Sequence, residues 1–153
     1  MEIRTTRFGT LEFPDEMILK VAGGLLGFSH AESYVVFEHD ADGSPFKWFQ
    51  AADDPNLAFI IMDPHQIVPD YLNRTEKDVR DAIGPFDPQD ISTIAIVTVP
   101  ADRPIEMTAN LRAPIVIKFS ERTGKQIILT DDQFNLNHRI FDGASIPQKA
   151  AAR

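Results

Sequence analysis

The chain has no cysteine, which excludes a disulfide framework, a thiolate nucleophile and a zinc site built from cysteines. No apolar run approaches the length of about 18 residues that a membrane-spanning helix needs. The N-terminal stretch MEIRTTRFGTLEF also lacks the apolar segment of a secretion signal. These absences predict a cytoplasmic protein that does not bind a membrane.

Basic residues are in short supply as well, because 15 Lys and Arg stand against 23 Asp and Glu and give a formal net charge of −8. Direct nucleic-acid binding relies on basic side chains that displace counterions from phosphates, so this balance disfavours it. An acidic chain is instead soluble and can steer a basic protein partner towards itself.

The length of 153 residues fits one domain, and a chain of this size can bury a core without covalent staples. Apolar residues make up 43% and charged residues 25%, as in ordinary globular proteins. The last segment, DGASIPQKAAAR, contains mostly small and polar residues. We therefore expect one domain over residues 1–141 and a flexible tail over residues 142–153.

Short apolar runs dominate the chain and predict a mainly β protein. They centre near Val36, Trp48, Ile60, Ile96, Val116 and Ile128. Regularly spaced short strands indicate a small single-domain fold that is β-barrel-like or a sandwich. The runs YVVF, AFIIM, IAIVTV and QIIL are nearly continuous, so we expect strands that are covered on both faces.

Turn residues and aromatic residues add detail to this prediction. Gly9 is expected to turn TTRF back into TLEF, and Gly124 to turn VIKF into QIIL. Trp48 is expected in the core beside Phe46 and Phe59, because Phe46 and Trp48 are spaced like residues on one face of a strand.

One short helix is predicted near residues 75–83. Thr75 is the expected N-cap, because its hydroxyl can accept a free N–H of the first turn. Val79 and Ile83 are four residues apart and form an apolar stripe, while Gly84 and Pro85 end the helix.

Residues that could carry chemistry are scattered. The histidines His30, His39, His65 and His138 form no metal-binding pair. Asp63, His65 and Asp70 in DPHQIVPD could bind a metal. Pro64 and Pro69 favour the simpler interpretation of a tight loop in which Asp63 caps the following turn.

Two further stretches are better explained by structure than by catalysis. The adjacent Asp53 and Asp54 in AADDPNLAF are typical of a turn and would point oppositely on a strand. The glycines of VAGGLLGF lack the spacing of a phosphate-binding loop and indicate backbone with positive φ. The sequence thus indicates no enzyme, no cofactor and no metal.

The segment MTANL, residues 107–111, precedes a predicted core strand but fits neither a helix nor a strand. Two interpretations stay open. Met107 and Leu111 could offer apolar contacts to a partner while Thr108 and Asn110 offer hydrogen bonds. Alternatively, Thr108 and Asn110 cap the end of a sheet and pack internally.

The segments RFGTLEF, GGLLGFSHAESYVVF, PFKWFQAADDPNLAFIIMDP, IAIVTVP, MTANLRAPIVI and GKQIIL occur in an order that resembles the FliW flagellar assembly factors. The resemblance extends from Arg7 to Phe141. It implies a small cytoplasmic barrel-like protein that binds flagellin before export. It also implies binding to CsrA, the RNA-binding repressor of flagellin translation, from which flagellin would displace it.

This partner switch would couple flagellin synthesis to export, and a basic partner such as CsrA would suit the acidic charge. The residues expected to contact partners are Met107, Thr108, Asn110, Leu111, Asp53, Asp54 and Asp63. Two alternatives stay open, namely an export chaperone for flagellin without a role in translation, and a metal-dependent hydrolase that uses Asp63, His65 and Asp70.

Overall fold

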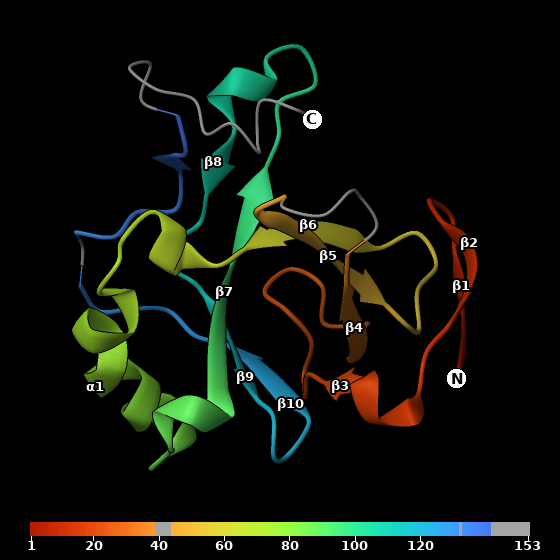
Figure 1. Cartoon of the computed structure of the whole chain (residues 1–153), viewed down its shortest axis with the longest axis horizontal. Helices are drawn as coiled ribbons and strands as arrows, with labels where there is room; N and C mark the ends of the chain where they lie inside the picture. Colours follow the sequence, from red (N-terminus) through yellow and green to blue (C-terminus); the bar gives the residue numbers. More distant parts are fainter. Residues whose placement is uncertain (39–43, 132, 142–153) are drawn as a thin grey trace.

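Short strands are the main regular elements of the computed structural model, which describes residues 1–38, 44–131 and 133–141 (Figure 1). The strands are β1 (Glu2–Thr5), β2 (Gly9–Glu12), β3 (Leu19–Lys20), β4 (Ser33–Phe37), β5 (Phe46–Ala51), β6 (Ala58–Met62), β7 (Ile91–Thr98), β8 (Thr108–Ala109), β9 (Ile115–Lys118), β10 (Thr123–Gln126) and β11 (His138–Arg139). The helices are α1 (Tyr71–Ile83) and the 3-10 turns η1 (Asp15–Met17), η2 (Pro64–Gln66), η3 (Pro88–Asp90) and η4 (Pro104–Glu106). The predicted tail, residues 142–153, and His39 lie outside the described residues.

Seven of the described strands close into a barrel. The order β7-β6-β5-β4-β3-β10-β9 returns to β7, because β9 pairs with the first half of β7. Neighbouring strands run antiparallel except β10 and β3, which pair in parallel through Thr123 and Lys20. The prediction of a mainly β, barrel-like fold is confirmed. The strands expected around YVVF, AFIIM and IAIVTV are present as β4, β6 and β7.

The barrel interior is filled by alternate residues of the closing strands, because successive side chains of a strand point to opposite faces. The connection between β3 and β4 adds three further buried residues. Together the buried members are Leu19, Val21, Leu25, Ala31, Tyr34, Phe49, Ala51, Ile61, Ile94, Ile115 and Ile117. The rings of Tyr34 and Phe49 stack with centroids 4.5 Å apart. Residues of β6 and β7 pack into clusters on both faces of the sheet, as their nearly continuous apolar runs predicted.

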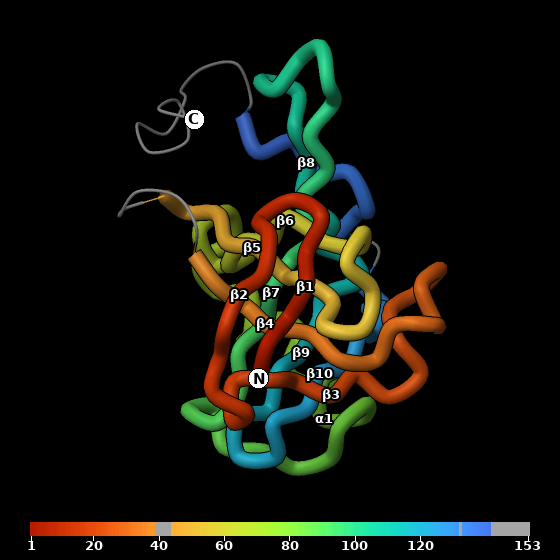
Figure 2. Tube along the Cα trace, turned by 90° about the vertical axis from the view of Figure 1, so that its right-hand side faces the viewer, coloured from red at the N-terminus to blue at the C-terminus, as the bar shows by residue number. Residues whose placement is uncertain are grey.

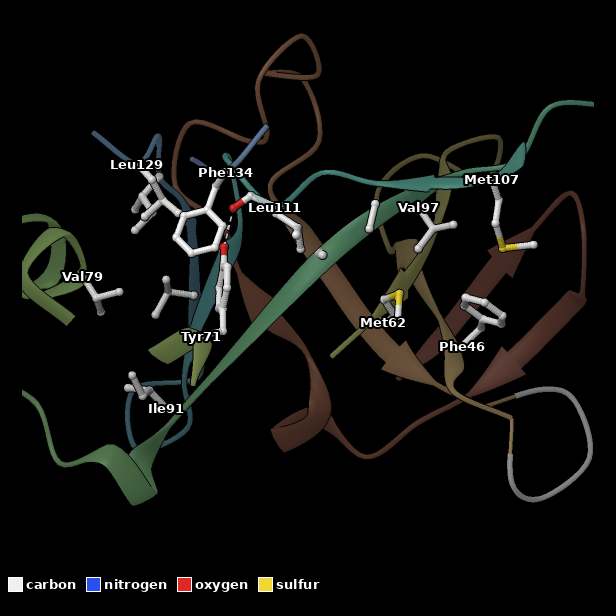
Figure 3. Close-up of a cluster of buried hydrophobic side chains, with 14 of the residues drawn as sticks. Phe46, Met62, Tyr71, Val79, Ile91, Val97, Met107, Leu111, Leu129 and Phe134 are labelled. Carbon is white, nitrogen blue, oxygen red and sulfur yellow. Dashed lines mark hydrogen bonds between the residues drawn. The ribbon is translucent and has the colours of Figure 1, made fainter. Parts of the chain in front are cut away.

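A second core lies outside the barrel, where α1, residues 107–111 and the chain after β10 pack with outward-facing residues of β5, β6, β7 and β9 (Figure 3). Tyr71, Thr75 and Val79 recur every four residues and form the buried stripe of α1. The predicted helix is present but begins four residues earlier. Thr75 is not its N-cap, because it lies inside the helix with its hydroxyl 2.9 Å from the carbonyl oxygen of Tyr71.

The N-terminal hairpin β1–β2 packs against β4 and β5 on the side opposite α1 (Figures 1 and 2). The predicted turn at Gly9 is confirmed, with a φ of +72°. Phe8 meets Trp48 edge-on at 5.0 Å between ring centroids, and the Arg7 guanidinium lies 4.9 Å from the Trp48 ring. The expected core position of Trp48 is wrong. Trp48 is half-buried under the hairpin, on the opposite face of the sheet from the interior residue Phe59.

The hairpin β9–β10 also differs from its prediction. Arg122, with a φ of +54°, provides the left-handed turn residue, whereas Gly124 lies within β10. A Cβ on Gly124 would approach the Val21 side chain to 3.2 Å, so its smallness serves packing of β10 against the segment that follows β3. The strand predicted over QIIL, residues 126–129, was placed too far along the chain, because β10 ends at Gln126. Ile128 is exposed.

Candidate functional site

The segment MTANL does not form a free rim loop. Thr108 and Ala109 form β8, which pairs with Val97 and Thr98 at the end of β7. Met107 and Leu111 are buried in the outer core, with exposed fractions of 7% and 1%. This position corrects the expectation that their side chains offer exposed apolar contacts to a partner. Thr108 and Asn110 are half-buried, and their contact with a partner stays a prediction.

Asn110 forms a corner between two strands that share one edge of β7. Its N–H donates to the Ile96 carbonyl oxygen at 2.9 Å. Its Oδ1 accepts from the N–H groups of Arg112 and Ala113 at 3.1 and 2.9 Å. The chain can therefore leave β8 and enter β9 in a different register on the same edge of β7. The need for this corner explains a polar residue between two buried apolar ones.

The helix α1 holds the same corner from outside. The Tyr71 hydroxyl donates to the Leu111 carbonyl oxygen at 2.6 Å, a bond drawn in Figure 3. Burial raises the pKa of Tyr71, so the hydroxyl keeps its proton and remains a donor. The Leu111 N–H donates to the Asn135 carbonyl oxygen at 3.1 Å. Three distant segments thus meet at residue 111.

We expect Asn110→Ala to lower the free energy of unfolding by about 1–3 kcal/mol, because two backbone N–H groups would lose their shared acceptor. Asn110→Asp is the matched control, since it keeps an oxygen acceptor, and it should lose clearly less. Chemical denaturation of both variants measures the difference. Equal stability of Asn110→Ala and the parent protein would contradict the corner role and would favour a contact with a partner.

The predicted turn at Asp53 and Asp54 is confirmed. Asp54 Oδ1 accepts from the Asn56 N–H at 3.0 Å, and Asp54 Oδ2 lies 2.8 Å from His30 Nε2. The hydrogen bond from His30, with the backbone bond from Asn56, holds the pKa of Asp54 below its usual value. Asp53 Oδ2 accepts from the Glu32 N–H at 2.9 Å. The two carboxylates therefore tie the β5–β6 turn to the loop before β4.

The buried Tyr34 lies near this acidic turn. Burial, and then the charges of Asp53 and Asp54, raise its pKa to about 12. Its hydroxyl has no hydrogen-bond partner among the described residues. Its ring belongs to the barrel interior, so Tyr34 stays neutral and acts there as a large apolar side chain.

Asp63 and His65 form the tight loop that their prolines predicted. Asp63 Oδ1 accepts from the His65 N–H at 2.9 Å and lies 2.7 Å from His65 Nδ1, so Asp63 caps η2. His65 Nε2 in turn accepts from the Leu72 N–H at 3.1 Å, in the first turn of α1. Asp70 occupies the N-cap position of α1. Within residues 1–38, 44–131 and 133–141, no three acidic or histidine residues are grouped as metal ligands.

The structure does not bring the predicted contact residues into one site. Asp53 and Asp54 follow β5 and precede β6, whereas Asp63 follows β6, so the two groups lie at opposite ends of that strand. MTANL lies across β7 from β6. Each group instead holds its own turn or corner. The exposed carboxylates of Asp53 and Asp63 remain accessible from outside.

Sequence reasoning missed an open cavity of about 510 Å³ at one end of the barrel. Its lining includes Ile94 and Ile117 from the interior, and Met17 and Phe119 at the opening. The available signal was the alternation of Ile115, Ile117 and Phe119, which continues the inward face of β9 to the strand end. We name this opening the barrel mouth.

The fold and these sites define a small closed β-barrel protein whose polar candidate residues hold turns and corners. In the part of the chain that the structure describes, no helix has the length and apolar character to cross a membrane. A family model described as FliW protein matches residues 2–140.

The flagellar assembly factor FliW of Caldanaerobacter subterraneus subsp. tengcongensis is 32% identical over 142 residues, which cover 93% of this chain and 94% of the relative. That of Treponema denticola is 37% identical over 92% of this chain and 94% of the relative. A crystal structure of the flagellar assembly factor FliW matches with a TM-score of 0.79 at 30% identity, and covers 95% of this chain and all of the other. The chain therefore belongs to the FliW family of flagellar assembly factors.

Proposed function

We propose that this protein binds flagellin before export and also binds the translational repressor CsrA, and that flagellin displaces CsrA. Free protein then holds CsrA away from flagellin mRNA, and unexported flagellin releases CsrA to stop further synthesis. The observation that carries this proposal is membership of the FliW family over residues 2–140. The protein acts by exchanging partners in the cytoplasm, and no reaction is catalysed.

The charge of the chain supports the CsrA half of the proposal. An RNA-binding repressor presents basic groups for phosphates, and an acidic protein complements them. The net charge of −8 provides the attraction. The exposed Asp53 lies on a turn that two hydrogen-bonded carboxylates hold rigid, which suits a preformed contact surface.

The direct test uses purified protein with flagellin and CsrA from the same bacterium. We expect each partner to bind alone, and added flagellin to release bound CsrA. Binding of flagellin without any binding of CsrA would leave only the export-chaperone role. No binding of flagellin would overturn the proposal.

Electrostatic steering predicts a salt-dependent association with CsrA. The association rate should fall as salt rises, since charges are screened over about 8 Å at 0.15 M ionic strength. Asp53→Asn should slow association about two- to threefold at low salt and change dissociation less. Stopped-flow or surface-based kinetics over a salt series measures both rates.

The matched control is Asp87→Asn, which removes one charge from another carboxylate that also caps a backbone N–H, that of Gln89. Both substitutions keep an oxygen acceptor, so both turns are retained. A larger effect at Asp53 than at Asp87 identifies a local contact surface. An association rate that stays flat across the salt series would reject steering.

A further inference from the structure

The barrel mouth is an open end of the barrel interior. Inward-facing residues of β3, β4, β6, β7 and β9 form its apolar floor, namely Leu19, Val36, Ile61, Ile94 and Ile117. Small barrels are normally filled by their own side chains or hold one ligand. A cavity of about 510 Å³ lies within the range of ligand-binding pockets, about 300–1,000 Å³.

The two halves of the interior are filled differently. Away from the mouth, the stacked rings of Tyr34 and Phe49 and the edge-on pair of Phe28 and Phe59 occupy the space. The mouth has only aliphatic side chains on its floor, and the small Ser92 lines it from β7. Among the described residues that line this end, the one aromatic side chain is that of Phe119, at the opening.

The opening carries exposed apolar groups. Met17 of η1 is 42% exposed and Phe119 is 55% exposed, and both line the cavity. Each costs free energy while it faces water, and large exposed apolar groups around a cavity mark binding surfaces. The apolar surface thus continues from the floor of the cavity to the rim of its opening, which we name the lip.

Charges of both signs surround the lip. Glu16 and Arg122 line the cavity and have no ion-pair or hydrogen-bond partner for their side chains within the described residues. Lys47 and Asp63 also line it and have partners, since Lys47 lies 3.8 Å from Glu38 and Asp63 caps η2. A bound molecule can therefore form ion pairs with the carboxylate of Glu16 and the guanidinium of Arg122.

We propose that the barrel mouth binds a polypeptide segment that inserts one or two large apolar side chains into the cavity. Charged residues on either side of them in the segment pair with the charged residues around the opening. Because the lip is apolar, a polypeptide that passes across the opening fits this site better than a small molecule enclosed inside the cavity. The inference rests on the proposed function, in which the segment belongs to flagellin. CsrA fits less well here, because the lip charges are balanced and do not select a basic partner.

The test measures flagellin affinity for two mouth variants and one control. Phe119→Glu places a charge on the lip, and Ser92→Phe fills the cavity from β7. Leu136→Glu is the matched control, because Leu136 is 53% exposed and lies outside the mouth, before β11. We expect both mouth variants to weaken flagellin binding tenfold or more, and the control to stay within twofold of the parent protein. Melting curves confirm that each variant is folded.

Methyl NMR gives a second measurement that does not depend on the variants. The isoleucine methyl signals of Ile61, Ile94 and Ile117 should shift when flagellin binds, and that of Ile127 in the outer core should not. If flagellin binds the parent protein while both mouth variants keep their affinity and these methyl signals stay unchanged, the inference is overturned and the proposed function stands. Failure of the parent protein to bind flagellin overturns both. Methyl shifts produced by octanoate but not by flagellin would assign the cavity to a small ligand and also overturn the inference.

Discussion

Gly24→Ala is expected to destabilise the protein by at least about 3 kcal/mol, because the backbone around residue 24 leaves no space for a side chain. A Cβ there would lie 2.4 Å from the Phe28 carbonyl oxygen and 2.7 Å from the Ser29 Cα. These are backbone atoms, so relief requires the loop before β4 to move. The φ of +71° adds further strain for any residue with a side chain.

Gly23→Ala is the control for this prediction. Gly23 has a similar φ of +79°, but its Cβ would meet no atom within 4 Å. Only the conformational cost remains there, about 1–2 kcal/mol. Thermal and chemical denaturation of the two variants separates the steric effect from the conformational one. Equal losses for both would show that crowding at Gly24 is not a constraint.

The sequence VAGGLLGF indicated backbone with positive φ, and Gly23, Gly24 and Gly27 all have it. The sequence did not reveal which glycine is crowded. That property depends on how the chain returns past residue 24 on its way to β4, which is a feature of the folded loop.

Strands were predictable where β-branched residues form continuous runs, but closure of the barrel was not. The ring is completed by the parallel contact between Lys20 and Thr123, supported by a bond of 2.9 Å from the Lys20 N–H to the Arg122 carbonyl oxygen. This pairing joins segments about a hundred residues apart, and two-residue strands carry too little pattern to be recognised. The start of α1 was predicted four residues too late, because Thr75 has the character of an N-cap when only the neighbouring sequence is considered.

The structural roles of the MTANL residues were the least predictable part. The residues of MTANL fit no regular element, and a binding loop and a structural corner share that property in sequence. Only the structure shows that the Asn110 side chain accepts hydrogen bonds from the N–H groups of Arg112 and Ala113. It also shows that the Leu111 carbonyl oxygen accepts one from the Tyr71 hydroxyl. The barrel mouth was missed because its lining residues are far apart in the chain.

Trp48 and Phe49 illustrate the limit of the two-residue period. In a strand covered on both faces, the alternation divides residues into two sets but does not say which set faces the barrel interior. Phe46 and Trp48 do share a face, as predicted, but it is the outer one. The neighbouring Phe49 faces inward and is fully buried.

Phe49→Ala should therefore cost about 3–5 kcal/mol, the range for a buried aromatic residue, because it removes the ring that stacks on Tyr34. Trp48→Ala should cost only about 1–2 kcal/mol, since Trp48 is half-buried and loses mainly its contacts with Phe8 and Arg7. Domains of this kind have about 5–15 kcal/mol of stability, so the first change brings the protein near unfolding and the second does not.

Denaturation followed by circular dichroism compares the two variants on the same scale. Trp48 is the one tryptophan in the chain, so its fluorescence also reports unfolding of Phe49→Ala. In Trp48→Ala the hairpin β1–β2 should exchange its amide hydrogens faster, while β5 and β6 keep their protection, because the loss lies on the outer face. If Trp48→Ala proved the more damaging change, the hairpin contact would contribute more stability than the stacked rings in the barrel interior.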